Sequence, residues 1–397
     1  MQAEEVRKIR KDITKNMKVI FERNALIAAV LPLMGSVSDK NTNVATEGVL
    51  ISTTGSDGCI LSAYNMERGM RATLSAQVLE EGSYIVNANK LSQIVRTLPD
   101  GDVQIEVNDR CVTKITGGRS VFELHAIRGS EFPNLPDLNI DTGIRLRQGD
   151  LKDMIASTFF AMAQDDPRPV MNGSLFEING SVLSIVACDG ERLALKKKTC
   201  EIGTIGDGQA EPMRFVVPGK SLAELQKLLK DPDAEVMMKV TRKHMILSTK
   251  NYLLFTRLIE EEYFDYDRFI PKSSKIYVKI NCDDFISSLE RAVLVTEDRT
   301  MGQTKSPLVC CFKENCLEVS SNSVTGSVYD EIPIEKEGDD LKIGFECRNL
   351  LDALRACDCT EIKLALTTAL MGMVIEPDND DTENTFLFLV LPVRMQE

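Results

Sequence analysis

The chain has 397 residues, 43% of them hydrophobic, and a formal net charge of −13. This length allows two to four domains with packed cores, and the longest apolar runs are too short to cross a bilayer. The acidic balance argues against a protein that grips nucleic acid by a general basic surface, although positive charge could still be confined to one face. Eleven cysteines cannot all pair within one chain, and their scatter is typical of a reduced cytoplasmic protein.

The first elements follow a charged N-terminus. Residues 1–16 have no apolar region of the kind found in secretory signals, so we expect a short helical or frayed extension. The pattern then predicts a strand from Met17 and a helix from about Asn24 to Met34.

Two blocks of sequence recur three times. One is a strand–turn–helix–strand block in which a leucine lies at the helix start, and its copies are 131 and 128 residues apart. The other is a strand–helix block with separations of 125 and 134 residues. Two blocks with nearly one period predict tandem domains, since the period is domain-sized. The helix positions are Leu91, Leu222 and Leu350 for the first block and Leu26, Leu151 and Phe285 for the second.

The second and third copies start after linkers that contain proline and polar residues. The second begins near Gly143, with Asp150 as the expected N-cap of its helix. The third begins near Lys275 and enters its helix after Asp283 and Asp284. We therefore expect an extension and three domains, with the boundaries 1–16, 17–141, 142–272 and 273–397.

Between the helices, the sequence predicts antiparallel strands. Apolar residues alternate with polar ones, as at Val103, Ile105 and Val107. Turn dipeptides such as Asn179-Gly180 and Asp189-Gly190 predict hairpins. Each repeat is thus an α+β domain with two helices and antiparallel sheets, and strands at domain edges are expected to pair across the boundaries.

Catalytic and metal-binding signals are weak. The chain has no phosphate-binding loop and no dinucleotide glycine fingerprint. His125 and His244 lie in predicted strands, where a structural role is the simpler interpretation, and the cysteine spacings do not match zinc sites. Cys188 beside Asp189 is a conceivable nucleophile, but no base lies near it in sequence. We predict no catalytic residue, no metal and no cofactor.

Two features leave alternatives open. Cations recur on the predicted helices; they either lie on ordinary exposed faces or form a positive lining inside an acidic body. The apolar C-terminal segment, Phe386–Glu397, is either a last core strand or part of a peptide site beside an open groove.

Four segments resemble the bacterial sliding clamp family, the β subunits of DNA polymerase III, and the similarity runs from Met17 to the C-terminus. They are EFPNLPDL (131–138), MNGSLFEINGSVLSIVACDGERLA (171–194), YFDYDRFIPK (263–272) and VLPVRM (390–395). The resemblance implies three tandem clamp-fold domains that form half of a six-domain ring. Two such chains would encircle double-stranded DNA as a homodimer, without catalysis of their own.

The resemblance also implies a hydrophobic pocket between the second and third domains. It would receive short peptide motifs of the replicative polymerase, the clamp loader and repair proteins. Glu191 and Phe264 stand where many members have His and Pro. The pocket residues implied are Met171, Cys188, Gly190, Arg192, Leu193, Arg268, Phe269, Leu370, Leu389, Leu391, Pro392, Val393, Arg394 and Met395.

For the dimer interface, the resemblance implies that Phe122 and Leu124 pack against Leu294 and Val295 of the second copy. Two other classes of function remain as alternatives. One is an enzyme with its site at the turn from Asp189 to Arg192; the other is a scaffold that forms an open arc and binds no DNA. The cations expected to face DNA are Lys40, Lys90, Arg96, Lys152, Arg168, Lys220, Lys227, Arg291 and Arg348.

Overall fold

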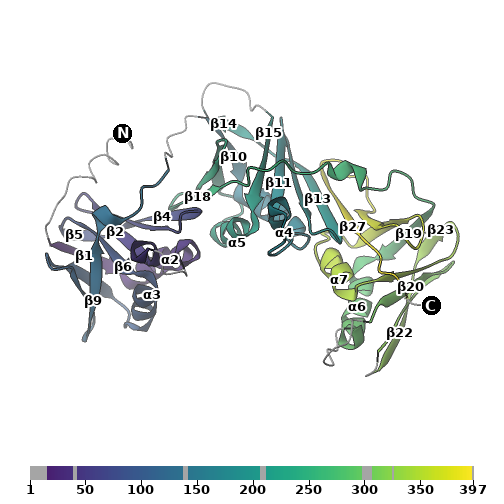
Figure 1. Ribbon diagram of the computed structural model, residues 1–397, viewed down its shortest axis with the longest axis horizontal. Helices are drawn as coiled ribbons and strands as arrows, with labels where there is room; N and C mark the ends of the chain where they lie inside the picture. The colour runs from purple at the N-terminus through teal and green to yellow at the C-terminus, as the bar shows by residue number, and fades with distance from the viewer. Residues whose placement is uncertain are drawn as a thin grey trace. The chain divides into compact units, whose positions relative to one another are not determined.

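The structure is a computed structural model. It describes residues 16–38, 43–136, 142–205, 212–296, 306–323 and 326–395. The chain divides into two compact units, and the middle repeat contributes to both. Figure 1 labels the helices and strands named below. The first unit comprises residues 1–148, 203–209 and 220–258, and the second comprises residues 149–202, 210–219 and 259–397.

The first unit contains two helices from the first repeat and one from the second. They are α2 (Arg23–Leu33), α3 (Ala88–Thr97) and α5 (Gly219–Leu228), with short 3-10 turns η1 (Met34–Ser36), η2 (Val44–Glu47) and η3 (Gly129–Glu131). Its strands are β1 (Met17–Glu22), β2 (Gly48–Thr54), β3 (Gly58–Tyr64), β4 (Arg68–Ser75), β5 (Gln77–Glu80), β6 (Ser83–Asn87), β7 (Asp102–Val107), β8 (Val112–Gly117), β9 (Ser120–Arg128), β10 (Gly143–Arg147), β14 (Gly203–Ile205), β16 (Glu235–Val240), β17 (His244–Ser248) and β18 (Tyr252–Arg257).

These strands form one continuous sheet in the described residues, in the order β14-β10-β16-β17-β18-β4-β3-β2-β6-β9-β8-β7-β1-β5. The predicted alternation is confirmed, since Val103, Ile105 and Val107 are fully buried. Side chains that precede the helices cap them. The carboxylate of Glu22 accepts hydrogen bonds from the first N–H groups of α2, and Asn87 accepts one from the N–H of Lys90 in α3.

The second unit contains α4 (Gln148–Phe159), α6 (Cys282–Thr296) and α7 (Cys347–Arg355), with 3-10 turns η4 (Pro169–Asn172) and η5 (Tyr266–Arg268). Its strands are β11 (Gly173–Asn179), β12 (Val182–Cys188), β13 (Arg192–Thr199), β15 (Met213–Pro218), β19 (Ile276–Asn281), β20 (Leu308–Phe312), β21 (Cys316–Asn322), β22 (Ser327–Pro333), β23 (Glu335–Glu337), β24 (Leu341–Phe345), β25 (Glu361–Leu366), β26 (Met373–Pro377) and β27 (Asn384–Val390).

Two sheets run through the described part of this unit. One has the order β15-β11-β12-β13-β27-β26-β25-β19-β23, and the other has the order β22-β21-β20-β24. In Figure 1, α6 and α7 lie side by side. With two helices and antiparallel sheets in each of three repeats, the predicted α+β fold class is confirmed.

Strands pair across the boundaries between repeats, as the sequence predicts. In the first unit, β18 of the second repeat pairs antiparallel with β4 of the first, from Tyr252↔Ala72 to Thr256↔Arg68. In the second unit, β13 pairs antiparallel with β27 of the third repeat, from Arg192↔Val390 to Lys198↔Asn384. The repeats are therefore joined by backbone hydrogen bonds as well as by linkers.

Two predicted helix starts are wrong by a few residues. Asp150 lies in the first turn of α4, which begins at Gln148, and is not its N-cap. Likewise, α6 begins at Cys282, so Asp283 and Asp284 lie in its first turn. An acidic side chain is favoured in both places, either as a cap or beside the positive end of the helix dipole, so composition alone does not separate them.

The predicted N-terminal extension lies outside the described residues, except for Asn16. No helix in the described ranges is long and apolar enough to cross a membrane. The domain boundaries given above remain a prediction.

Candidate functional site: an apolar surface at the junction of the second and third repeats

An apolar row crosses the sheet where β13 meets β27. Cys188 of β12 is paired with Leu193 of β13, and Leu193 is paired with Leu389 of β27. Leu389 is in turn paired with Val374 of β26. These side chains are 2–9% exposed and belong to one buried cluster with Met171. The row therefore brings three predicted pocket residues together, and the buried cluster adds Met171 as a fourth.

The turn between β12 and β13 forms a rigid rim beside this floor. The Oδ1 atom of Asp189 accepts hydrogen bonds from the backbone N–H groups of Glu191 at 2.9 Å and Arg192 at 2.7 Å. Gly190 has a φ of +95°, a conformation that favours glycine. A Cβ atom at Gly190 would lie 3.5 Å from the guanidinium of Arg168. The predicted glycine is thus a backbone requirement of the turn.

The C-terminal tail is docked along the third repeat. The N–H of Leu391 donates to the carbonyl oxygen of Glu191 at 2.9 Å, and the N–H of Val393 donates to the carbonyl oxygen of Gly344 at 2.9 Å. The side chain of Met395 packs so closely on Gly344 that an added Cβ would lie 2.8 Å from its Cγ. These contacts hold the tail against the turn that carries Glu191 and against Gly344 of β24.

Large apolar side chains are exposed around the floor. Leu370, in the turn after β25, is 79% exposed, Phe269 is 62% exposed and Leu391 is 43% exposed. The ring of Phe269 packs edge-on against Phe264, with centroids 5.6 Å apart. Exposed apolar groups beside a buried apolar floor are typical of a surface that accepts a short apolar ligand.

The remaining predicted pocket residues occupy the periphery. Arg268 has a largely exposed side chain that forms an ion pair with Asp265 at 2.7 Å. Arg394 is exposed and Pro392 is half-buried.

Arg192 has a position that the sequence did not reveal. Its side chain is 12% exposed and is paired with Asp189 at 2.9 Å and with Asp352 of α7 at 3.1 Å. The guanidinium also lies 5.6 Å from the ring centroid of Phe160. The ion pair with Asp352 therefore links the rim to α7. In addition, the Nδ2 of Asn349 donates to the carboxylate of Glu191 at 2.7 Å.

Arg192 is the first of three paired cations on one side of β13. Alternate residues of a strand share a face, and Lys196 and Lys198 follow at that spacing. Lys196, 2% exposed, is paired with Asp358 at 2.6 Å, and Lys198 is paired with Asp150 at 2.7 Å. This row of ion pairs supports the strand that carries the pocket floor.

The alternative of an active site at the Asp189–Arg192 turn finds no support. Burial raises the pKa of the Cys188 thiol, which disfavours a nucleophilic thiolate. The carboxylate of Asp189 is occupied by the turn and by Arg192. Burial also raises the pKa of the Tyr263 hydroxyl, which has no hydrogen-bond partner among the described residues. In the part of the chain that the structure describes, no group of His, Cys, Asp and Glu is arranged to hold a metal.

The residues predicted for the dimer interface lie on open strand edges and on an exposed helix end. Phe122 and Leu124 are half-buried on β9, which pairs with β8 over residues 120–125 and with β6 only over 126–128. Among the described strands, β22 pairs only with β21. Leu294 on α6 is 79% exposed, and Val295 beside it is half-buried. Each edge offers unpaired backbone groups to another chain.

The cations predicted to face DNA differ in their pairing. All those described are exposed, and Lys40 lies outside the described residues. Four contact acids: Arg168 pairs with Asp166, Lys227 with Glu224, Arg291 with Asp330 and Arg348 with Asp352. The other four have no ion-pair partner within the described ranges: Lys90 and Arg96 on α3, Lys152 on α4 and Lys220 on α5.

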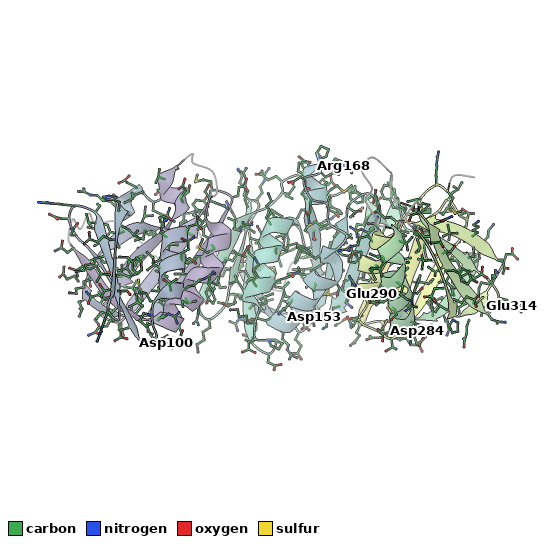
Figure 2. All side chains as sticks on the ribbon, turned by 90° about the horizontal axis from the view of Figure 1, so that it is seen from below. Asp100, Asp153, Arg168, Asp284, Glu290 and Glu314 are labelled. Carbon is green, nitrogen blue, oxygen red and sulfur yellow. The ribbon has the colours of Figure 1, made fainter. Side chains whose placement is uncertain are left out.

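The helices that carry these cations also carry exposed acids, including Asp153 on α4 and Asp284 on α6. Figure 2 shows Asp153 and Arg168 at opposite edges of their unit. The lysine-bearing helix α4 is therefore not uniformly basic. The net positive charge available on these helices is small, which favours weak, sequence-independent phosphate contacts over tight binding.

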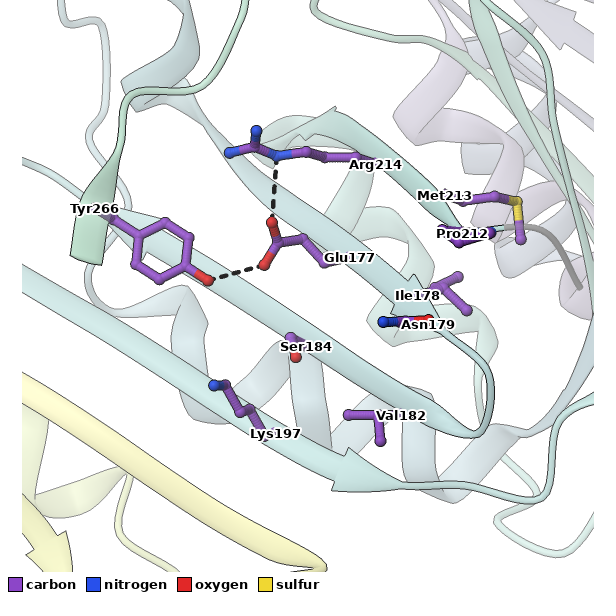
Figure 3. A pocket seen from close by; sticks show the side chains of 10 residues that line it. All are labelled: Glu177, Ile178, Asn179, Val182, Ser184, Lys197, Pro212, Met213, Arg214 and Tyr266. Carbon is purple, nitrogen blue, oxygen red and sulfur yellow. Dashed lines mark hydrogen bonds and ion pairs between the residues drawn. The ribbon is translucent and has the colours of Figure 1, made fainter.

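A cavity of about 500 Å³ lies on the same sheet but away from the apolar row (Figure 3). Its floor is a cross-strand line in which Arg214, Glu177, Ser184 and Lys197 are paired in register. Glu177 accepts a hydrogen bond from Tyr266 at 2.8 Å and pairs with Arg214 at 3.2 Å. Sequence reasoning did not single out these residues, because an alternation of polar residues is typical of any solvated strand face.

Comparisons with known proteins find the same family along nearly the whole chain. The models of the N-terminal, central and C-terminal domains of the DNA polymerase III beta subunit match residues 17–136, 145–265 and 267–394. A protein of Halalkalibacterium halodurans named beta sliding clamp is 34% identical over 389 residues, which cover 95% of this chain and all of the relative.

Solved structures are similar as well. The DNA polymerase sliding clamp of Bacillus subtilis has a TM-score of 0.89 and 28% identity, covering 96% of this chain and 100% of that one. A sliding clamp of Pseudomonas aeruginosa bound to griselimycin has a TM-score of 0.85 and 25% identity at the same coverage. With three domain models in order and a relative matched over its whole length, the chain belongs to the DNA polymerase III beta subunit family, the bacterial sliding clamps.

Proposed function

We propose that this chain is a non-catalytic processivity clamp. Two copies close head to tail into a ring of six domains around double-stranded DNA, and the ring tethers the replicative polymerase to its template. The family membership supports the clamp function. The three domains of each copy would be residues 17–141, 142–272 and 273–397, and three consecutive family-model matches support this division. The DNA of a bacterium lies in its cytoplasm, so we place the clamp there.

The homodimer is supported by complementary open edges on one chain. The free edge of β9 beside Phe122 and Leu124 can pair with the free edge of β22, and the exposed Leu294 with Val295 can cover the apolar side chains. Edge-to-edge pairing provides partners for backbone N–H and C=O groups that would otherwise form hydrogen bonds only with water. Because β9 and β22 belong to the first and third repeats, this contact is heterologous and must close into a ring or propagate.

Partner proteins are held by the apolar groove, and this site is the observation that carries the tethering role. Its floor is the row from Cys188 through Leu193 to Leu389, and its rim includes Phe269 and Leu391. The polymerase, the clamp loader and repair proteins would insert short apolar motifs there. The griselimycin complex of the Pseudomonas aeruginosa clamp supports ligand binding in the family.

Two measurements test the proposal. Electron-microscopy class averages should contain closed rings with a central hole and six similar lobes; compact particles without a hole would overturn the ring. A clamp loaded onto nicked circular DNA should remain bound at high salt and should leave after the circle is linearised. Loss at the same rate from circular and linear DNA would favour an open scaffold instead.

A further inference from the structure

Two cysteines far apart in sequence meet in the third repeat. Cys282 is the first residue of α6, and Cys357 lies two residues beyond the end of α7. Strands β19 and β25 pair up to Asn281↔Glu361, and the N–H of Cys282 then donates to the carbonyl oxygen of Thr360 at 2.8 Å. This pairing places the start of α6 directly beside the segment that follows α7.

Both thiols contact the last turn of α7. The Cys282 thiol donates to the carbonyl oxygen of Leu354 at 3.6 Å, and the backbone N–H of Cys357 donates to that same oxygen at 3.1 Å. The Cys357 thiol donates to the carbonyl oxygen of Ala353, the residue before Leu354, at 3.6 Å. Ala353 and Leu354 are adjacent residues, so both thiols lie at the same end of α7.

The surroundings distinguish the two thiols. Cys282 is 3% exposed, whereas Cys357 is partly exposed. The Cys357 thiol lowers the pKa of Cys282 and outweighs the opposing effects of burial, Asp283 and Glu361. The N-terminus of α6 also favours a thiolate there. The neighbouring Cys282 and burial raise the pKa of Cys357. Cys282 is thus the better nucleophile, with a neutral thiol held against it.

We propose that Cys282 and Cys357 form a reversible disulfide when the protein meets hydrogen peroxide. The Cys282 thiolate attacks one peroxide oxygen and becomes a sulfenic acid, and the hydroxide that leaves takes up a proton to give water. The Cys357 sulfur then attacks the sulfenic sulfur, and its proton leaves with the hydroxyl as a second water. Two thiols are oxidised to one disulfide, and one peroxide is reduced to two waters. A thiol reductant reverses the bond by exchange.

The bond would tie the start of α6 to the end of α7. Helix α7 carries Asn349 and Asp352, which hold Glu191 and Arg192 at the rim of the apolar groove. Closing the long loop from Cys282 to Cys357 restricts the unfolded chain, so oxidation is expected to raise the melting temperature of the third repeat. The same bond fixes the helix that positions the groove rim.

Peptide mapping tests the pair directly. Trypsin cleavage separates Ile280–Arg291, with Cys282 as its only cysteine, from Ala356–Lys363, which contains Cys357 and Cys359. After peroxide treatment of the full chain and alkylation of free thiols, we expect these two peptides to be linked and to separate with dithiothreitol. The link should be absent in Cys282→Ser and in Cys357→Ser but present in Cys359→Ser.

The half-exposed Cys316 on β21 provides the matched control. Cys316→Ser should keep the linked peptides and the reversible rise in melting temperature, which Cys282→Ser should lose. A link that persists in Cys357→Ser would overturn the proposal in favour of Cys359. Oxidation of Cys282 to a sulfinic acid without any linked peptide would also overturn it.

Discussion

The buried ion pair between Lys196 and Asp358 gives a quantitative test of how the second and third repeats are joined. Lys196 lies on β13 opposite Phe386 of β27, its side chain is 2% exposed, and its ammonium lies 2.6 Å from Asp358. Removing one partner of a fully buried pair costs about 3–5 kcal/mol. Because Asp358 is 45% exposed, water screens the pair, so we expect Asp358→Asn to cost about 2 kcal/mol.

The opposite substitution should behave differently. Lys196→Met removes the charge that needs a partner, together with the ammonium's contact with the Phe386 ring, and leaves an apolar side chain of similar length, so we expect a change within about 1 kcal/mol. In that background, Asp358→Asn should cost at most about 0.5 kcal/mol, which leaves a coupling energy of about 1.5 kcal/mol between the two residues. Lys197→Met is the matched control, because the neighbouring lysine is exposed and should change stability by less than about 0.5 kcal/mol.

Hydrogen exchange is the suitable assay, because unfolding of a chain with several domains is not a single two-state transition. The amides of β13 and β27 should exchange roughly 30-fold faster in Asp358→Asn than in the parent chain, as a cost of about 2 kcal/mol requires. Equal exchange in these two chains would refute the reasoning, since it would mean that Lys196 does not depend on Asp358. If Lys196→Met lost as much stability as Asp358→Asn, that result would also contradict the reasoning.

Three further perturbations address the interface, the groove and the core. Leu294→Asp puts a charge on an exposed apolar position of α6, so we expect monomers by sedimentation and at least about 100-fold weaker association, with unchanged folding. Phe269→Ala, together with removal of the chain from Met395 onward, should weaken a partner peptide by about 10-fold or more in fluorescence anisotropy without opening the ring. Tyr263→Phe removes a buried hydroxyl for which the described part of the chain offers no hydrogen-bond partner, and hydrogen exchange should show the second unit stabilised by about 1 kcal/mol.

A different result would contradict each of these three predictions. A dimer that persists in Leu294→Asp would place the interface elsewhere. Unchanged peptide affinity after both groove changes would mean that the peptide binds elsewhere. Leu79→Ala is the control, because this exposed leucine lies on β5, outside the groove, and should not change the affinity. A destabilised Tyr263→Phe chain would mean that the hydroxyl is engaged.

The local pattern of the sequence predicted most of the fold. The hairpin at Asn179-Gly180 and the buried alternation from Val103 to Val107 are confirmed, since both depend on neighbours within one strand pair. Helix starts at α4 and α6 were misplaced by a few residues, because an acid is favoured both at a cap and in the first turn.

The ion pairs beneath the groove were not predictable from local pattern. Lys196, Lys197 and Lys198 are identical in type, yet only Lys196 is almost fully buried. Its partner Asp358 is 162 residues away, so the contact exists only after β13 and β27 have paired. The predicted groove residues came from family motifs; composition and spacing alone would not have separated Leu193 and Leu389 from ordinary core residues.

The pairing of β13 with β27 also has a consequence for the order in which the chain is completed. β13 is synthesised well before β27, which follows it only after nearly all of the third repeat. One edge of β13 must therefore wait without its neighbour until β27 has been made and has left the ribosome. Emergence of β27, rather than synthesis of the second repeat, is the event that closes this sheet. A nascent chain that stalls before β27 would present an open apolar edge, which is the kind of surface that chaperones bind.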